Sequence, residues 1–98
     1  MTSQISQIIG QIAAYNPEKI ILFGSYARGK PHKDSDVDLV LIKKTKDSFG
    51  KRLKKVRMLL HTTTPVDVFV FTPQEFEKAK RTNPFIEEVW RFGKVIYG

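Results

Sequence analysis

The chain has 98 residues, with 17 Lys or Arg against 10 Asp or Glu, so its formal net charge is +7. This length predicts a single domain over residues 1–98, and the positive charge favours an anionic partner. Because the chain has no cysteine, disulfides, thiolate metal sites and thiol nucleophiles are excluded. It also has no apolar run near the ~18 residues of a membrane span and no signal-like start, so we expect a cytoplasmic protein.

The first half of the sequence predicts one helix followed by two strands. Isoleucines recur at helical spacing within residues 3–15, and the Asn16-Pro17 pair ends that helix. The short apolar runs 19–23 and 37–42 indicate buried strands. Since no long helix separates these two strands, they are not joined by the crossover that parallel neighbours need. We therefore expect a mixed sheet.

The second half alternates further helices and strands. Apolar periodicity predicts a helix over 49–60, and the run 65–71 predicts a third strand. A Thr-Pro-Gln-Glu capping box starts a helix over 72–81. A second helix over 84–92 and a strand over 94–97 complete the chain. The pattern predicts an α+β fold, a mixed β-sheet with helices packed mainly on one face.

The helix over 84–92 carries four large apolar side chains. These are Phe85, Ile86, Val89 and Trp90. We interpret them as the core-facing side of the helix, in preference to a partner-binding face.

A Gly24-Ser25 pair ends the first strand, immediately before residues that favour one helical turn. Glycine permits a sharp bend and close approach of a ligand to the backbone. A serine hydroxyl and backbone N–H groups at such a turn are oriented to bind phosphate. Gly-Ser is also an ordinary turn dipeptide, so it does not identify a site by itself.

Two carboxylates, Asp36 and Asp38, stand at the start of the second strand. Because side chains alternate along a strand, both lie on the same face. Two acids on one face repel each other, and aspartate is disfavoured in strands. A divalent cation such as Mg²⁺, which prefers oxygen ligands, would offset that repulsion. The alternative is a pair of solvated acids at a strand end.

A third carboxylate, Asp67, lies within the apolar strand Val66–Phe71. Burying such a group is costly unless it is paired or metal-bound. If the second and third strands are neighbours, Asp67 joins the other two acids. The alternative is an acid on an edge strand or in a salt bridge to lysine. Three carboxylates beside a phosphate-binding turn predict two-metal phosphoryl or nucleotidyl transfer.

The combination is more specific than its parts. Gly24-Ser25, ten further residues, Asp36-x-Asp38 and the later Asp67 resemble the DNA polymerase β-type nucleotidyltransferase superfamily. The string GSYARGKPHKDSDVDLVL resembles the minimal nucleotidyltransferases of bacteria and archaea. The resemblance extends over essentially the whole chain and implies a polymerase β-like palm core.

The resemblance also implies a role for each residue on the phosphate side. Ser25 would contact the terminal phosphates of the nucleotide, and Gly24 would permit the turn. Arg28 would steady the triphosphate, although a surface arginine is an equally ordinary interpretation.

On the metal side, the resemblance implies that Asp36 and Asp38 bind two Mg²⁺ ions. Asp67 would bind the catalytic ion and help to deprotonate the acceptor hydroxyl. ATP would be the substrate that supplies AMP.

Members of this minimal family are commonly paired with a small all-helical HEPN-type RNase toxin and act as its antitoxin. The resemblance therefore implies a Mg²⁺-dependent transferase that attaches AMP to a tyrosine of such a partner. The short chain, which lacks the accessory domains of larger relatives, also favours a partner that completes the site. One alternative is a non-catalytic module that neutralises a helical partner by contact.

A second alternative is an RNA-directed nucleotidyltransferase. Residues 43–57 hold 8 of the 17 basic residues, which suits an RNA backbone or an acidic protein surface. A solvated helix face is the more ordinary interpretation. No aromatic residues alternate with these basic residues, so base stacking is not supported.

Overall fold

The computed structural model describes residues 3–29 and 36–98. The elements in chain order are α1 (Ser3–Ile12), a short 3-10 turn (Ala13–Tyr15), β1 (Lys19–Phe23), β2 (Val37–Ile42), α2 (Phe49–Leu59), β3 (Val66–Phe71), α3 (Pro73–Thr82), α4 (Pro84–Phe92) and β4 (Lys94–Tyr97). The sequence predicted each of these helices and strands. None of the helices in the described ranges is long and apolar enough to cross a membrane.

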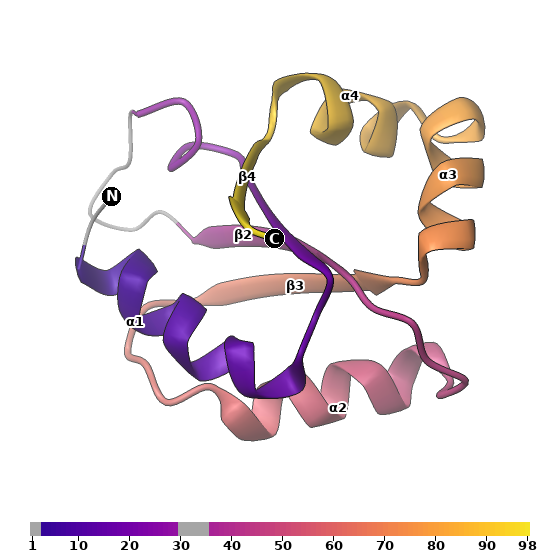
Figure 1. Cartoon of the computed structure of the whole chain (residues 1–98). Coiled ribbons are helices and arrows are strands. Elements are labelled where there is room, and N and C mark those ends of the chain that lie inside the picture. The colour runs from indigo at the N-terminus through magenta and orange to yellow at the C-terminus, as the bar shows by residue number, and fades with distance from the viewer. Residues whose placement is uncertain (1–2, 30–35) are drawn as a thin grey trace.

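The four strands form a mixed sheet in the order β3-β2-β1-β4, which confirms the predicted fold class. β1 runs antiparallel to both β2 and β4, whereas β2 and β3 run parallel. The parallel pair is possible because α2 carries the chain back between the two strands (Figure 1). β3 therefore forms one edge of the sheet and β4 the other.

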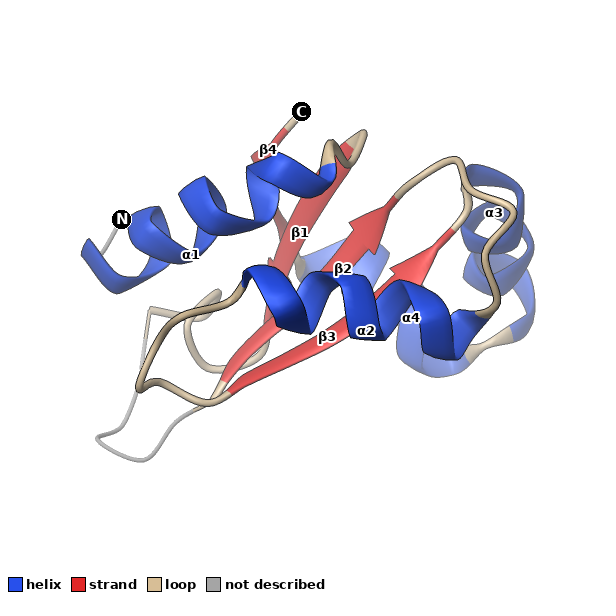
Figure 2. Cartoon of the chain, turned by 90° about the horizontal axis from the view of Figure 1, so that it is seen from below, coloured by secondary structure: helices blue, strands red, loops and turns tan. Residues whose placement is uncertain are grey.

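The helices cover both faces of the sheet, so the prediction that they pack mainly on one face was wrong. α1 and α2 lie on one face and α3 and α4 on the other (Figures 1 and 2). Each pair of helices closes its own apolar core against the sheet. The reason is visible in β1 and β2, whose residues are almost all apolar, so both faces of these strands need cover.

Arg52 of α2 ties the two helical layers together around the outer edge of β3. Arg52 is 6% exposed, and its guanidinium group donates two hydrogen bonds to the Glu75 carboxylate of α3, of 2.7 and 3.2 Å. It also donates to the backbone oxygens of Asp47 and Val70, at 3.0 and 3.1 Å. Glu75 in turn completes the predicted capping box with Thr72. One side chain thus joins α2, β3 and α3.

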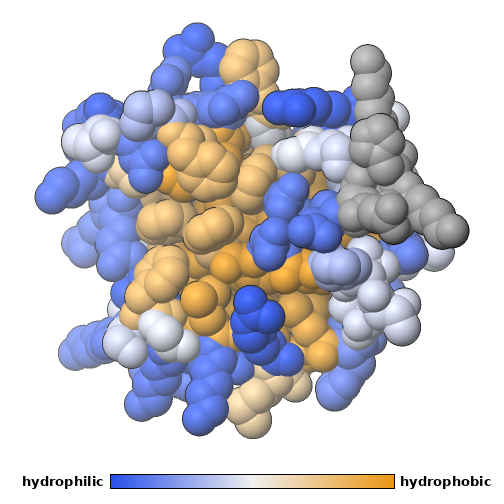
Figure 3. Space-filling view, turned by 180° about the vertical axis from the view of Figure 1, so that it is seen from behind, coloured by the Kyte–Doolittle hydropathy of each residue, from blue (hydrophilic) through white to orange (hydrophobic). Residues whose placement is uncertain are grey.

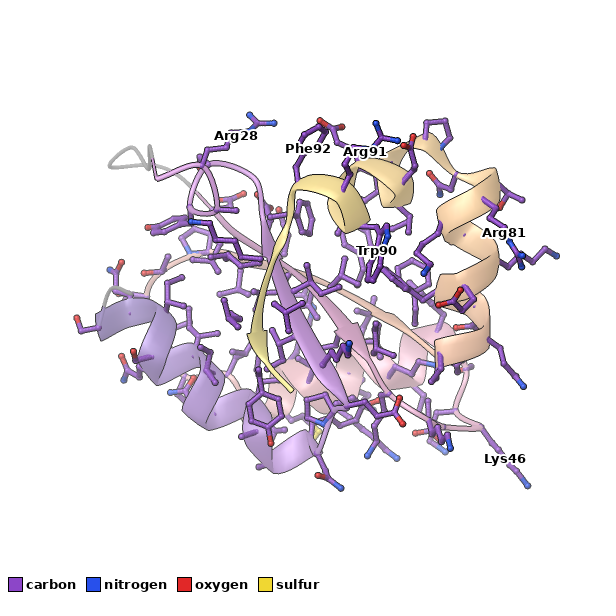
Figure 4. All side chains as sticks on the ribbon, turned by 45° about the horizontal axis from the view of Figure 1, so that its top comes forward. Arg28, Lys46, Arg81, Trp90, Arg91 and Phe92 are labelled. Carbon is purple, nitrogen blue, oxygen red and sulfur yellow. The ribbon has the colours of Figure 1, made fainter. Side chains whose placement is uncertain are left out.

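The apolar residues of α4 divide between core and surface. Ile86 and Val89 are buried as predicted, at 1% and 3% exposure. The assignment of Phe85 and Trp90 to the core was wrong, because they are 43% and 50% exposed. Successive helix residues are about 100° apart, so a short helix turns one narrow stripe to the sheet and leaves its flanks outside. Trp90 instead lies toward α3 (Figure 4). There the Lys80 ammonium is 4.0 Å from the centroid of its ring, and the Phe76 ring meets it edge to face.

Further apolar surface gathers along the uncovered edge of β3. Phe71 at the end of this strand meets Phe49 of α2 edge to face, with ring centroids 6.1 Å apart. Figure 3 shows apolar side chains grouped on this side of the molecule.

Substitution of Arg52 by Met is expected to lower the free energy of unfolding by about 2–3 kcal/mol. The loss is below that of a fully enclosed pair because the Glu75 side chain is 46% exposed. Arg57→Met, an exposed arginine of the same helix, is the matched control and should change little. Urea titration measures both.

The loss of stability in Arg52→Met should depend on pH. The hydrogen bond from Arg52 lowers the pKa of Glu75 below its ordinary value of 4.5. The ion pair therefore stabilises the protein above that value and is lost as pH falls through the lowered pKa. The stability difference between the wild type and Arg52→Met should shrink in acid. A difference that is constant from pH 7 to pH 3 would show that the charge of Glu75 contributes nothing.

Candidate active site

The pairing of β2 with β3 places two of the three predicted acids side by side. Asp38 and Asp67 are direct partners in the parallel register, and the negative charge of Asp67 acts on the Asp38 carboxyl group. Both point to the face covered by α3 and α4, because Val40 and Phe69, two residues further along each strand, pack there. The sheet thus presents a carboxylate pair at the start of its parallel strands.

Asp36, the third predicted acid, lies at the rim of this pair. It is exposed and precedes the first residue of β2, but its charge still acts on Asp38. Within residues 3–29 and 36–98, no three potential ligand side chains are grouped closely enough to hold a metal ion together. Of the three predicted acids, the structure therefore brings Asp38 and Asp67 together and leaves Asp36 at the rim.

Asp67 is exposed, although its neighbours in the sequence are apolar. The reason is that β3 is an edge strand, so the argument from the cost of burial does not apply to this residue. No salt bridge joins Asp67 to any residue in the described part of the chain. Its register with Asp38 is what places it at the site.

The pKa of Asp38 lies above its ordinary value of 3.8. Partial burial is the largest cause, followed by the negative charges of Asp67 and Asp36 and the hydrogen bond with Asp67. Two facing carboxylates favour a cation between them, and their oxygens are the ligand type that Mg²⁺ prefers. The donor set therefore fits a divalent metal.

Gly24 brings the turn that follows β1 directly against Asp38. It follows β1 with φ of +75°, a conformation that residues with a side chain rarely adopt. A Cβ atom at this position would overlap the Asp38 carboxylate. No other residue type would leave room for that carboxylate at this position.

The turn itself is short and hydrogen-bonded. The Arg28 amide donates to the Gly24 carbonyl at 3.2 Å, and the Gly29 amide donates to the Tyr26 carbonyl at 3.3 Å. This is one turn of helical character, as the sequence predicted, within which Ser25 is half-buried. Ser25 therefore stands one residue beyond the glycine that touches Asp38.

Arg28 extends from the turn into solvent (Figure 4). Its guanidinium group lies 3.9 Å from the Glu88 carboxylate of α4, and the two side chains are 72% and 60% exposed. A long, exposed ion pair contributes little to stability. Arg28 can therefore exchange this partner for an anion at small cost.

A pocket of about 240 Å³ lies between the turn and α4. Its lining includes Phe23, Phe85, Phe92, Arg28 and Glu88. The sequence pattern did not predict this pocket, because Phe85 has the spacing of a core residue of α4. Gly93 also lines the pocket and lies close to β1, since a Cβ there would be 2.5 Å from the Val89 backbone oxygen and 2.7 Å from the Ile21 side chain.

Comparisons with known proteins show the family to which the chain belongs. Residues 5–98 match the family described as "Polymerase beta, Nucleotidyltransferase". The chain belongs to this nucleotidyltransferase family. A candidate protein adenylyltransferase of Methanocaldococcus jannaschii is 32% identical over 76 residues, which are 78% of this chain and 75% of that protein. The crystal structure of a candidate nucleotidyltransferase from Sulfolobus solfataricus superimposes with a TM-score of 0.65 at 22% identity, covering 94% of this chain and 75% of that one.

In this nucleotidyltransferase, Gly24→Ala is expected to lower the free energy of unfolding by about 1–3 kcal/mol and to abolish nucleotidyl transfer. The methyl group would displace the Asp38 carboxylate from its position beside Asp67. Gly10→Ala is the matched control, because nothing lies within 4 Å of a Cβ at that helical position. It should stabilise the chain by about 0.5–1 kcal/mol and leave activity unchanged. Full activity in Gly24→Ala would contradict the close approach.

Proposed function

We propose that the chain is a Mg²⁺-dependent adenylyltransferase that moves AMP from ATP to a hydroxyl group of a partner protein. The observation that carries the proposal is the alignment of Asp38 with Asp67 directly beside the Gly24–Ser25 turn. The similarity to the candidate protein adenylyltransferase of M. jannaschii supports AMP as the transferred group and protein as the acceptor.

In this proposal the acids bind the metal and the turn binds the phosphates. Asp38 and Asp67 would hold Mg²⁺, with Asp36 at the rim as a further ligand for the second of two ions. When bound, Mg²⁺ lowers the pKa of an attacking hydroxyl and offsets the charge of the leaving pyrophosphate. Ser25 and the backbone N–H groups of its turn would bind the terminal phosphates. The chain thereby orients the α-phosphate toward the acids.

The transfer itself exchanges one bond to phosphorus for another. The acceptor oxygen bonds to the α-phosphorus, and the bond from that phosphorus to the pyrophosphate oxygen breaks. In this proposal, Asp67 takes the proton that the acceptor hydroxyl gives up. Because Asp67 is exposed on an edge strand, an acceptor on a separate protein can reach it from solvent.

We propose that this acceptor is a tyrosine of a small helical HEPN-type protein, which the chain would neutralise as an antitoxin. The resemblance to the minimal nucleotidyltransferases supports this choice. The position of the basic helix α2 makes RNA a weaker candidate, because α2 packs on the face of the sheet opposite to Asp38 and Asp67. An RNA bound along α2 would not be led into the site.

The test uses ATP labelled at the α-phosphate, Mg²⁺ and the protein encoded by the adjacent gene, which the proposal expects to be of the HEPN type. We expect label on a tyrosine of the partner, and none from ATP labelled at the γ-phosphate. Asp38→Asn and Asp67→Asn should lower the rate by about a hundredfold or more. Asp47→Asn, an acid paired with Lys55 on the α2 side, is the matched control and should keep the wild-type rate.

Three other outcomes would overturn parts of the proposal. Transfer that continues at the wild-type rate in Asp38→Asn would remove the proposed site. Neutralisation of the partner by that variant, without any label, would show a binding module. Label on tRNA offered in the same reaction, with none on the protein, would make the RNA-directed alternative correct.

A further inference from the structure

The pocket between the 24–29 turn and α4 has an aromatic wall that the proposed chemistry does not use. Phe23 of β1 and Phe85 of α4 meet edge to face, with ring centroids 5.4 Å apart. Phe92, at the end of α4, completes the lining and is 70% exposed. A phenylalanine this exposed beside a pocket gains stabilisation when a flat apolar group covers it.

The pocket is continuous with the site of transfer. Gly24 lines the pocket and also touches the Asp38 carboxylate. On the other side, the Phe85 ring packs on Phe69, at 5.8 Å between centroids, two residues beyond Asp67. The pocket therefore adjoins both the turn that we propose for the phosphates and the strand that carries Asp67.

The charged residues of the pocket stand at its exposed margin. Arg28 and Glu88 both line it, and Figure 4 shows Arg28 and Phe92 at the same end of the molecule. Their ion pair is loose, so each side chain can take a new partner. An ionised Glu88 accepts hydrogen bonds and donates none. It therefore favours a ligand that presents an N–H group over one that presents a carbonyl oxygen.

We propose that this pocket binds the base of the nucleoside triphosphate, with the phenylalanine rings stacking on it and Glu88 accepting from an exocyclic amino group. The inference rests on the proposed function, because the phosphates must lie on the Gly24–Ser25 turn. Adenine meets the requirement. Hypoxanthine, which has the same ring system with a carbonyl in place of the amino group, does not. Arg28, once released from Glu88, turns to the phosphates.

The test measures binding of three probes to the full chain in Mg²⁺: ATP, inosine triphosphate and tripolyphosphate. The wild type should bind ATP about three- to tenfold more tightly than inosine triphosphate. Phe92→Ala should weaken ATP binding about tenfold and leave tripolyphosphate binding unchanged. Glu88→Gln can donate to a carbonyl, so it should remove or reverse the preference for ATP. Met58→Ala, equally exposed at 70% but on α2, is the control and should alter no affinity.

The outcomes separate this inference from the function on which it rests. Equal affinity for the three probes, with AMP transfer intact, would overturn the base pocket alone. Unchanged ATP binding but slower transfer in Phe92→Ala would show that the pocket holds the acceptor, which also overturns it. Failure of the wild type to bind ATP or tripolyphosphate would overturn the proposed function, and this inference with it.

Discussion

The parallel pairing of β2 with β3 is the constraint on which the site depends. It sets Asp38 directly opposite Asp67, and the alternation of side chains sends both to the same face. A shift of one residue would turn Asp67 into the core beneath α1 and α2, where Val68 now packs. The crossover through α2 permits the parallel direction, and the Arg52–Glu75 pair holds that crossover helix to α3 around the edge of β3.

The charged groups and the restricted backbone of the candidate site lower the stability of the folded chain. Partial burial and the negative charges of Asp67 and Asp36 raise the pKa of Asp38, and Gly24 adopts a backbone conformation that favours glycine. The two apolar cores, one on each face of the sheet, supply the packing that holds these groups in place. A bound cation, as in the proposed function, would relieve this repulsion.

The sequence predicted the features that depend on residues close together in the chain. Apolar runs marked the strands, the Thr72–Glu75 capping box marked the start of α3, and the spacing of Gly24-Ser25 from Asp36-x-Asp38 marked the site. It could not give the β2–β3 register, because a shift of two residues leaves every side chain on the same face of the sheet. Nor did the sequence reveal the pocket, because its lining comes from segments that are far apart in the chain. The pairing of β4 with β1 holds α4 beside the turn and so brings these segments together.

The central claim is that Asp38 and Asp67 form one charged unit, and the pKa of Asp38 tests it without substrate or partner. Carboxyl-carbon NMR titration in the presence of a chelator would measure that pKa in the wild type and in Asp67→Asn. We expect a value above 3.8 in the wild type and a lower one in the variant, because a like charge has been removed. Asp47→Asn should leave it unchanged. The same Asp38 pKa in the wild type and Asp67→Asn would contradict the account.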